Sequence, residues 1–377
     1  MKIVILIDAL GWELLKDRQF LNDILVHRRG VRSVYGFSAG AIPSILTGLY
    51  PQEHKHWGLF YYSPENSPFR WTRGFAPFSD KSFPGRVWRH LVEKISRRRA
   101  RYSGYFETYL VPMQLLPFFD ICENKDIYKP DGVRAGNTIF DWISNRGIPW
   151  RTYTYREMND SQIIEAAHKD IDEGSSKVLF LYLCEFDAFL HRHRHDESAI
   201  TNKLAEYEEA VRSLYEHANG KDTESKLLVC SDHGMTTVHQ EHDLVSRVDS
   251  LGLRVPQDMI PMYDSTMARF WFKTMRAREQ VVQVLSETSY GHILTEDELR
   301  GYGVFFEDGR YGELIYAVDG GCVIAPSYMG RSAPQGMHGY LPEDPGMTAS
   351  LLTDFPVKRE LKDIACFRGV MEDMLED

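Results

Sequence analysis

The stretch Ile3-Val4-Ile5-Leu6-Ile7-Asp8 decides which fold the rest of the chain predicts. Five consecutive apolar residues, four of them β-branched, are typical of a strand that is buried on both faces. Two further runs of this kind follow, at residues 177–183 (KVLFLYL) and 226–230 (KLLVC). Strands buried on both faces belong to parallel sheets that helices cover on each side. The sequence therefore predicts a doubly wound α/β fold with a mostly parallel central sheet, helices on both faces and an inserted cap region.

The segments between these runs have the apolar spacing of helices, with one further strand expected at residues 149–155. The expected helices cover residues 11–26, 137–145, 160–172 and 195–218, and the carboxy-terminal segments 347–352 and 361–375. This alternation of strand and helix is typical of α/β proteins, whose sites form at the carboxyl ends of the strands.

The 377 residues are interpreted as a single α/β catalytic domain, residues 1–377, with cap-like insertions at about 57–130 and 240–325. The first insertion is dense in aromatic residues and is expected to lie over the active face; the alternative is a peripheral subdomain whose aromatics form its own core. Its basic run Arg97-Arg98-Arg99-Ala100-Arg101 is interpreted as a solvated helix face, with anion binding as the alternative.

The composition of the chain limits which partners and which cellular compartment are expected. The net charge of −10 argues against nucleic acid as the main partner. No run of 18 apolar residues occurs, so no membrane span is expected, and the amino-terminal apolar run is too short for a signal peptide. The odd number of scattered cysteines predicts thiols in a reducing compartment, and hence a cytoplasmic protein. These cysteines are Cys122, Cys184, Cys230, Cys322 and Cys366.

A second stretch, Gly36-Phe37-Ser38-Ala39-Gly40-Ala41-Ile42-Pro43, places one hydroxyl where a loop becomes a helix. Proline is tolerated in the first turn, so the helix is expected to begin just after Ser38, and Gly48 with Pro51 would end it. Ser38 then lies beside the N–H groups of a helix N-terminus, which suit an anion. Taken alone, the stretch fits either a helix N-cap or a nucleophile.

Acidic and imidazole side chains follow each of the three buried runs. Asp187 and His191 are four residues apart and so share one side of a helical turn. A lone histidine is more often structural, but three carboxylates and three imidazoles near strand ends predict a site for zinc or manganese. The candidate ligands are Asp8, Asp187, His191, Asp232, His233 and His338, the last in a glycine-rich loop.

A serine hydroxyl is a poor nucleophile unless a base or a metal activates it. Two metal ions can clamp both the attacking and the leaving oxygens of an in-line displacement at phosphorus. Ser38 together with the six candidate ligands therefore indicates metal-assisted phosphoryl transfer.

At this point the chain resembles the alkaline phosphatase superfamily, in the branch of type I phosphodiesterases and nucleotide pyrophosphatases. The resemblance covers residues 1 to about 350, with five motifs in the same order. They are Asp8 in IDALGWE, Ser38 nine residues before Thr47-Gly48-Leu49-Tyr50-Pro51, Asp187 and His191 as D-x-x-x-H, residues 231–235 (SDHGM), and residues 336–340 (GMHGY).

The resemblance implies a catalytic role for Ser38 and two divalent metal ions, with zinc preferred over manganese. Ser38 would attack phosphorus and form a phosphoserine intermediate on a small-molecule phosphodiester or pyrophosphate. One metal would lie among Asp8, Ser38, Asp232 and His233, and the other among Asp187, His191 and His338.

The residues after Ser38 depart from that branch, which usually has Thr followed by Phe-Pro-Asn. Ala41 stands where the asparagine would bind a phosphate oxygen, and Ala39 stands where an aromatic ring would support a nucleotide base. Sulfatases require Pro two and Arg four residues after the nucleophile, where this chain has Gly40 and Ile42. A phosphomonoesterase or sugar-phosphate mutase, and a non-catalytic metal-containing binding protein, are the alternatives to the phosphodiesterase.

Overall fold

The structure is a computed structural model and describes residues 1–73 and 83–376. It separates into two compact units. Unit 1 contains Met1–His54, Tyr128–Thr237 and Pro334–Asp377, and unit 2 contains Lys55–Ile127 and Val238–Ala333. Unit 2 is therefore built from segments that overlap the two expected insertions, while their placement over the active face stays a prediction.

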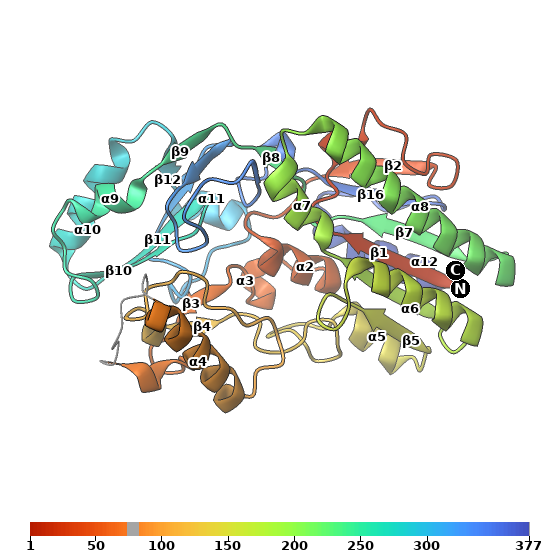
Figure 1. Ribbon diagram of the computed structural model, residues 1–377, viewed down its shortest axis with the longest axis horizontal. Coiled ribbons are helices and arrows are strands. Elements are labelled where there is room, and N and C mark those ends of the chain that lie inside the picture. The colour runs from red at the N-terminus through yellow and green to blue at the C-terminus, as the bar shows by residue number, and fades with distance from the viewer. Residues whose placement is uncertain (74–82, 377) are drawn as a thin grey trace. The chain divides into compact units, whose positions relative to one another are not determined.

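Unit 1 is organised around a six-stranded sheet with β1 near its centre (Figure 1). The order is β2 (His27–Val31), β16 (Ala349–Thr353), β7 (Lys226–Cys230), β1 (Lys2–Ile7), β6 (Val178–Leu183) and β5 (Trp150–Tyr153). Strand β1 pairs in parallel with β6 and β7, and β5 pairs in parallel with β6. Only β16 runs against its neighbours β7 and β2. The predicted mostly parallel α/β sheet is confirmed.

Helices pack on the sheet because its strands are apolar on both faces. Ile3, Ile5 and Ile7 share a buried cluster with α6 (Asp160–Glu173) and α8 (Glu197–Lys221). Side chains alternate along a strand, so Val4 and Leu6 face the other way. Helix α12 (Phe367–Glu376) packs against β1 and against α2 (Ser38–Thr47) and α5 (Ile139–Asn145). Further elements of unit 1 are α3 (Pro51–His54), α7 (Glu185–His193), β8 (Thr236–Thr237) and β15 (Gly336–Met337).

Two of the expected helices are wrong. The helix expected at 11–26 is only α1 (Trp12–Leu15), because Leu21 has a positive φ of 52° and Asn22 accepts a hydrogen bond from the amide of Phe20. Residues 347–352 are mostly strand β16, buried between β7 and β2. A short apolar run does not distinguish a buried strand from a buried helix by its periodicity.

Unit 2 is mostly antiparallel. Its four-stranded sheet has the order β10 (Met259–Tyr263), β11 (Met267–Phe272), β13 (Leu314–Val318) and β12 (Gly291–Ile293), and β3 (Phe60–Tyr62) pairs antiparallel with β4 (Phe119–Ile121) in a separate two-stranded sheet. Many aromatics of the first insertion, including Phe69 and Phe106, form one buried cluster with β10 and β11. Its other elements are α4 (Phe83–Ala100), β9 (Gln240–His242), α9 (Leu244–Asp249), α10 (Met275–Ser286), α11 (Glu296–Gly301) and β14 (Cys322–Ile324).

Across the residues that the structure describes, none of the helices combines the length and apolar character needed to cross a bilayer.

Candidate metal centre and nucleophile

Neighbouring parallel strands bring the first group of candidate ligands together. Asp8 directly follows β1, and Asp232 and His233 follow the adjacent strand β7. Each residue places one ligand atom within 4.8 Å of the others. The Nε2 atom of His233 lies 3.5 Å from Asp8 Oδ1 and 3.2 Å from Asp232 Oδ2. All three side chains are buried, so this group forms a compact acidic and imidazole pocket at the carboxyl ends of the strands.

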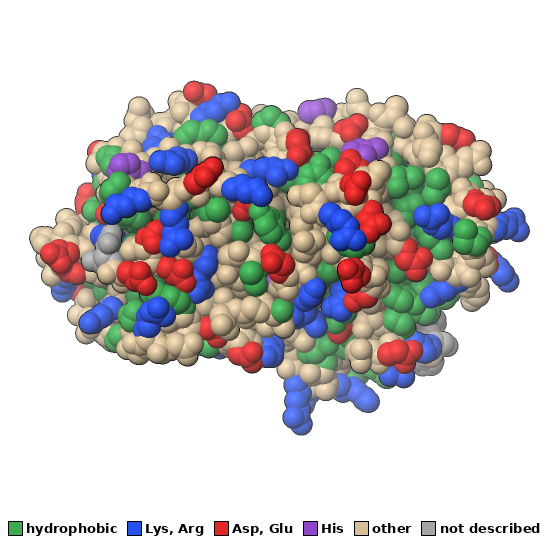
Figure 2. All heavy atoms as spheres, turned by 180° about the vertical axis from the view of Figure 1, so that it is seen from behind, with side chains coloured by type: hydrophobic (Ala, Val, Ile, Leu, Met, Phe, Trp, Pro, Cys, Tyr) green, Lys and Arg blue, Asp and Glu red, His purple; other side chains and the backbone are tan. Residues whose placement is uncertain are grey.

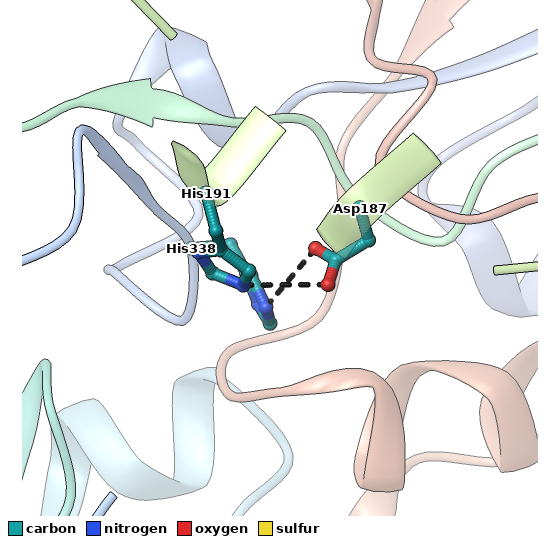
Figure 3. Close-up of side chains that lie close together, drawn as sticks. All are labelled: Asp187, His191 and His338. Atoms are coloured by element: carbon teal, nitrogen blue, oxygen red, sulfur yellow. Dashed lines mark ion pairs between the residues drawn. The ribbon is translucent and has the colours of Figure 1, made fainter. Parts of the chain in front are cut away.

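The second group lies on α7 and on the loop after β15 (Figure 3). Asp187 and His191 project from one side of α7, as their spacing predicts, and His338 points toward them from the loop. His191 Nε2 is 3.3 Å from Asp187 Oδ2, and His338 Nε2 is 3.5 Å from Asp187 Oδ1. The Nδ1–H of His191 can donate to the carbonyl of Gly336 at 2.8 Å, which leaves Nε2 available as an acceptor.

A pair of stacked imidazoles connects the two groups. The rings of His233 and His338 lie with their centroids 3.9 Å apart and their planes 13° apart. Strand β15 pairs with β8, which follows His233 in the chain, and this pairing holds the His338 loop beside the His233 loop. The six candidate ligands therefore form one continuous site within unit 1.

Only a glycine fits at residue 234, directly after the Asp232-His233 pair. A Cβ atom at this position would lie 2.3 Å from the carbonyl oxygen of Gly346. Gly11 approaches from the other side, where its own Cβ would lie 2.3 Å from the Cα of Gly234. The loops that carry Asp8 and His233 pack too closely for any side chain, so the two glycines fix the relative positions of the ligands.

Ser38 lies at the start of α2, with its Oγ atom 2.9 Å from His233 Nε2. The N-cap of α2 is Phe37, so the interpretation of Ser38 as the N-cap is wrong. The helix begins at Ser38 itself, and Pro43 lies in its second turn and not in the first as expected. Gly36, with φ of 122°, makes the turn that directs Ser38 toward the ligands.

Four carboxylate oxygens of the site lack hydrogen-bond donors in the described chain. Among the described residues, Asp8 Oδ1, Asp187 Oδ1 and both carboxylate oxygens of Asp232 have no hydrogen-bond partner. Burial and then the Asp232 carboxylate raise the pKa of Asp8 well above its usual value, against the Tyr182 hydroxyl, which donates to Asp8 Oδ2. Burial also opposes ionisation of Asp187, but His191 and His338 outweigh it and lower the pKa of Asp187.

The imidazoles respond to the same surroundings. Burial disfavours the charged form of His191, yet Asp187 outweighs it and raises the pKa of His191. Burial and the neighbouring His233 lower the pKa of His338 well below its usual value, so its ring is neutral. Buried carboxylate oxygens without hydrogen bonds, beside imidazole nitrogens, are the donors that divalent zinc or manganese prefers. The donor set therefore fits two divalent cations.

Sequence reasoning missed the residues that hold these side chains in place. Tyr182, on β6, orients Asp8. Asp160 accepts hydrogen bonds at 3.1 Å from the amides of Cys184 and Glu185 and so anchors the start of α7, while the residue before it, Asn159, caps α6. An acidic residue at the start of a helix was the available signal, but only the tertiary structure shows which helix it supports.

Comparison with known proteins places these features in a family. No curated protein sequence matches the chain. Among solved structures, human ectonucleotide pyrophosphatase / phosphodiesterase 5 is 13% identical with a TM-score of 0.70, over 99% of this chain and 94% of that one. The murine protein is 15% identical with a TM-score of 0.67, over 99% and 94% of the two chains. An inactive threonine-to-alanine variant of the murine protein, in complex with AMP, is 16% identical with a TM-score of 0.67 over the same shares.

At these identities the structural likenesses establish the fold. The family assignment comes from the sequence, because the family model described as type I phosphodiesterase / nucleotide pyrophosphatase matches residues 2–341. The chain therefore belongs to the type I phosphodiesterase / nucleotide pyrophosphatase family of hydrolases acting on phosphoester bonds.

Proposed function

We propose that the protein is a metal-dependent hydrolase of phosphodiester or pyrophosphate bonds in a small molecule, with Ser38 as its nucleophile. The observation that carries the proposal is the position of Ser38 Oγ, 2.9 Å from His233 Nε2 and at the start of a helix. A hydroxyl beside two groups of candidate cation ligands is the arrangement that in-line phosphoryl transfer requires.

Two divalent cations, zinc in preference to manganese, would be held by the two groups of ligands. Asp8, Asp232 and His233, together with Ser38, would hold one, and Asp187, His191 and His338 would hold the other. When bound, the cations would favour the ionised serine hydroxyl and withdraw negative charge from the phosphoryl oxygens.

In the first step Ser38 Oγ forms a bond to phosphorus while the bond from phosphorus to the leaving oxygen breaks. The product is a phosphoserine that still carries the second ester group of the substrate, and water then hydrolyses the serine ester to restore the hydroxyl. In the first turn of α2 the amides of Gly40 and Ala41 donate to the carbonyl of Phe37, which leaves those of Ser38 and Ala39 at the open N-terminal end of the helix. Because Ala41 has no donor in its side chain, these amides stabilise the phosphoryl oxygens in place of a side-chain amide.

We define the substrate by the bond that is cleaved, a phosphodiester or a pyrophosphate. A similar solved structure holds AMP, which supports nucleotide-like substrates for the fold. Ala39 offers no ring on which a base could stack, so this end of the site recognises the phosphoryl group and leaves the rest of the substrate to other residues.

Hydrolysis assays with the zinc-loaded or manganese-loaded protein test the proposal. We expect bis-p-nitrophenyl phosphate to be hydrolysed faster than p-nitrophenyl phosphate, and the Ser38→Ala variant to lose at least about a thousandfold in kcat. Ser38→Thr keeps the hydroxyl and should keep measurable turnover. Ser198→Ala is the matched control, since Ser198 is an exposed serine in the first turn of α8.

A Ser38→Ala variant with the same turnover as Ser198→Ala would contradict the role of Ser38. Preferential hydrolysis of the monoester would identify a phosphomonoesterase instead of a phosphodiesterase. Isomerisation of a sugar phosphate without phosphate release would identify a mutase.

We also propose that the protein works in a reducing compartment such as the cytoplasm. Within the described chain no disulfide joins any of the five cysteines, and three of them, Cys122, Cys230 and Cys322, are buried. Equal activity and stability with and without a reductant that keeps thiols reduced would support this, and loss of activity on reduction would contradict it.

A further inference from the structure

Within the described residues, the buried positions of helix α4 (Phe83–Ala100) in unit 2 lie along one side of the helix. Val92 and Ser96 are buried, and Ser96 Oγ accepts a hydrogen bond of 3.0 Å from the indole of Trp71. Arg89 donates to the carbonyl of Val111 at 2.8 Å. These contacts fix which face of the helix points outward.

The outward face carries exposed apolar side chains. Val87 and Leu91 lie one turn apart and keep 55% and 44% of their surface exposed. The neighbouring segment adds Leu110, which is 37% exposed and precedes the Val111 that Arg89 contacts. These are three of the five large apolar side chains exposed in the described chain, the others being Val26 and Met275. Apolar exposure is therefore concentrated on and beside α4.

The same face continues as a cationic surface. Lys94 and Arg98 follow Leu91 at helical spacing, Arg97 lies next to them, and Arg101 lies just beyond the end of the helix. None of these four cations forms an ion pair with an acidic side chain in the described ranges 1–73 and 83–376, although the whole chain carries a net charge of −10. Figure 2 shows blue side chains projecting from the lower edge, where α4 lies in Figure 1.

A hollow of about 770 Å³ opens beside these cations. Lys94, Arg97, Arg98 and Arg101 line it, together with His90, Glu93, Tyr102, Phe106 and Glu107. Its two acidic residues are engaged elsewhere, since Glu93 accepts from the amide of Thr108 and Glu107 accepts from the hydroxyl of Tyr105. The hollow therefore presents cations to any anionic group that enters it.

We propose that α4 binds the surface of an anionic lipid membrane. Lysine and arginine side chains would contact lipid phosphates and carboxylates, while Val87 and Leu91 enter the boundary between headgroups and acyl chains. The exposed apolar pair distinguishes this partner from a nucleic acid, whose phosphate backbone offers nothing for valine and leucine to bury against. Arg97, Arg98 and Arg99 are exposed on α4, which agrees with the solvated helix face expected from the sequence, and the proposal adds the anion-binding alternative to it.

Vesicle flotation with the full chain tests the proposal. Wild-type protein should bind vesicles of phosphatidylcholine with about one third phosphatidylserine, but not phosphatidylcholine alone, and binding should weaken as salt is raised. Replacing Lys94, Arg97 and Arg98 by Gln should lower vesicle affinity about fivefold for each cation removed. Val87→Ser with Leu91→Ser should also weaken binding while leaving all charges in place.

The control comes from α10, where Met275 is 66% exposed and Arg276 and Arg278 are exposed beside it. Met275→Ser with Arg276→Gln and Arg278→Gln should leave vesicle binding unchanged, and unfolding midpoints should show that every variant folds. Equal binding by the α4 and α10 variants would overturn the proposal. So would binding of single-stranded RNA, but not of vesicles, that depends on the arginines and is indifferent to Val87→Ser and Leu91→Ser.

Discussion

At the scale of single residues, the unusual feature of the site is a set of buried charges without hydrogen bonds. Asp232 is fully buried, and neither of its carboxylate oxygens has a donor among the described residues. Buried carboxylates normally accept hydrogen bonds, and leaving them without partners costs stability. Asp120 of unit 2 shows the usual arrangement, since Tyr61 and Tyr102 donate to its carboxylate at 2.6 and 2.7 Å.

Asp232→Asn should therefore change stability in opposite directions with and without metal. In EDTA the variant should be more stable than wild type by about 1 kcal/mol, because one of two repelling carboxylates is removed. Zinc should stabilise wild type but stabilise the variant much less. Asp120→Asn is the control and should be less stable by about 1–3 kcal/mol under both conditions. Urea unfolding gives all four values, and a loss of stability for Asp232→Asn in EDTA would contradict the explanation.

At the scale of helices and strands, the sequence predicts those features that depend on residues close together in the chain. The buried runs at 177–183 and 226–230 are strands, and Asp187 with His191 share one side of α7, as their spacing requires. The segment 11–26 fails because Leu21 adopts a positive φ, and 347–352 fails because tertiary pairing makes it a strand. Tyr182 and Asp160 form hydrogen bonds with residues on elements that are distant in sequence, and no local sequence pattern indicates such contacts.

The loop after β7 should tolerate no side chain at residue 234. A Cβ atom there would meet the carbonyl oxygen of Gly346 at 2.3 Å, so Gly234→Ala must displace the loop that carries His233. We expect a loss of more than about 2 kcal/mol of unfolding free energy and weaker zinc binding. Gly220→Ala is the control, because nothing lies within 4 Å of its Cβ position in α8. It should gain roughly 0.5–1 kcal/mol.

The contact between α6 and α8 should respond to pH. His168 Nδ1 lies 2.8 Å from His217 Nδ1, so one of these nitrogens must be unprotonated. Burial and then His217 lower the pKa of His168, against an opposing effect of Asp172. The unfolded chain therefore binds a proton at His168 more readily than the folded chain does. The contribution of neutral His168 to the free energy of unfolding is complete above about pH 6.5 and is lost as the pH falls toward the lowered pKa.

His168→Gln should accordingly lose less stability than wild type between about pH 7.5 and pH 5.5, as measured by urea unfolding at each pH. The control is Asn202→Ala at an exposed position of α8, which removes no titratable group and whose acid response should match that of wild type. An unchanged acid response in His168→Gln would show that this histidine does not carry the effect.

At the scale of the whole molecule, all seven candidate site residues belong to unit 1 and none to unit 2. Each of the three chain segments of unit 1 contributes: Asp8 and Ser38 come from the first, Asp187 to His233 from the second, and His338 from the third. A ligand bound there holds all three segments together.

Zinc should therefore slow amide hydrogen exchange unevenly along the chain. Strands β1, β6 and β7 and helix α2 should gain protection, because binding to the native state alone raises the free energy of opening by about 2.7 kcal/mol at a hundredfold excess over Kd. Strands β10, β11 and β13 of unit 2 should change little. Equal protection in both units would show that the binding energy is not confined to unit 1.

The central position of β1 also has a consequence for protein synthesis. Lys2 pairs with Val178, so β1 leaves the ribosome before its partner β6, which is made about 175 residues later. At about 5–20 residues per second, this apolar segment remains without its neighbours for roughly 10–35 s. A chaperone that shields nascent chains would act on this protein during that interval, and a truncated transcript that ends before β6 would yield a chain with an exposed, aggregation-prone strand.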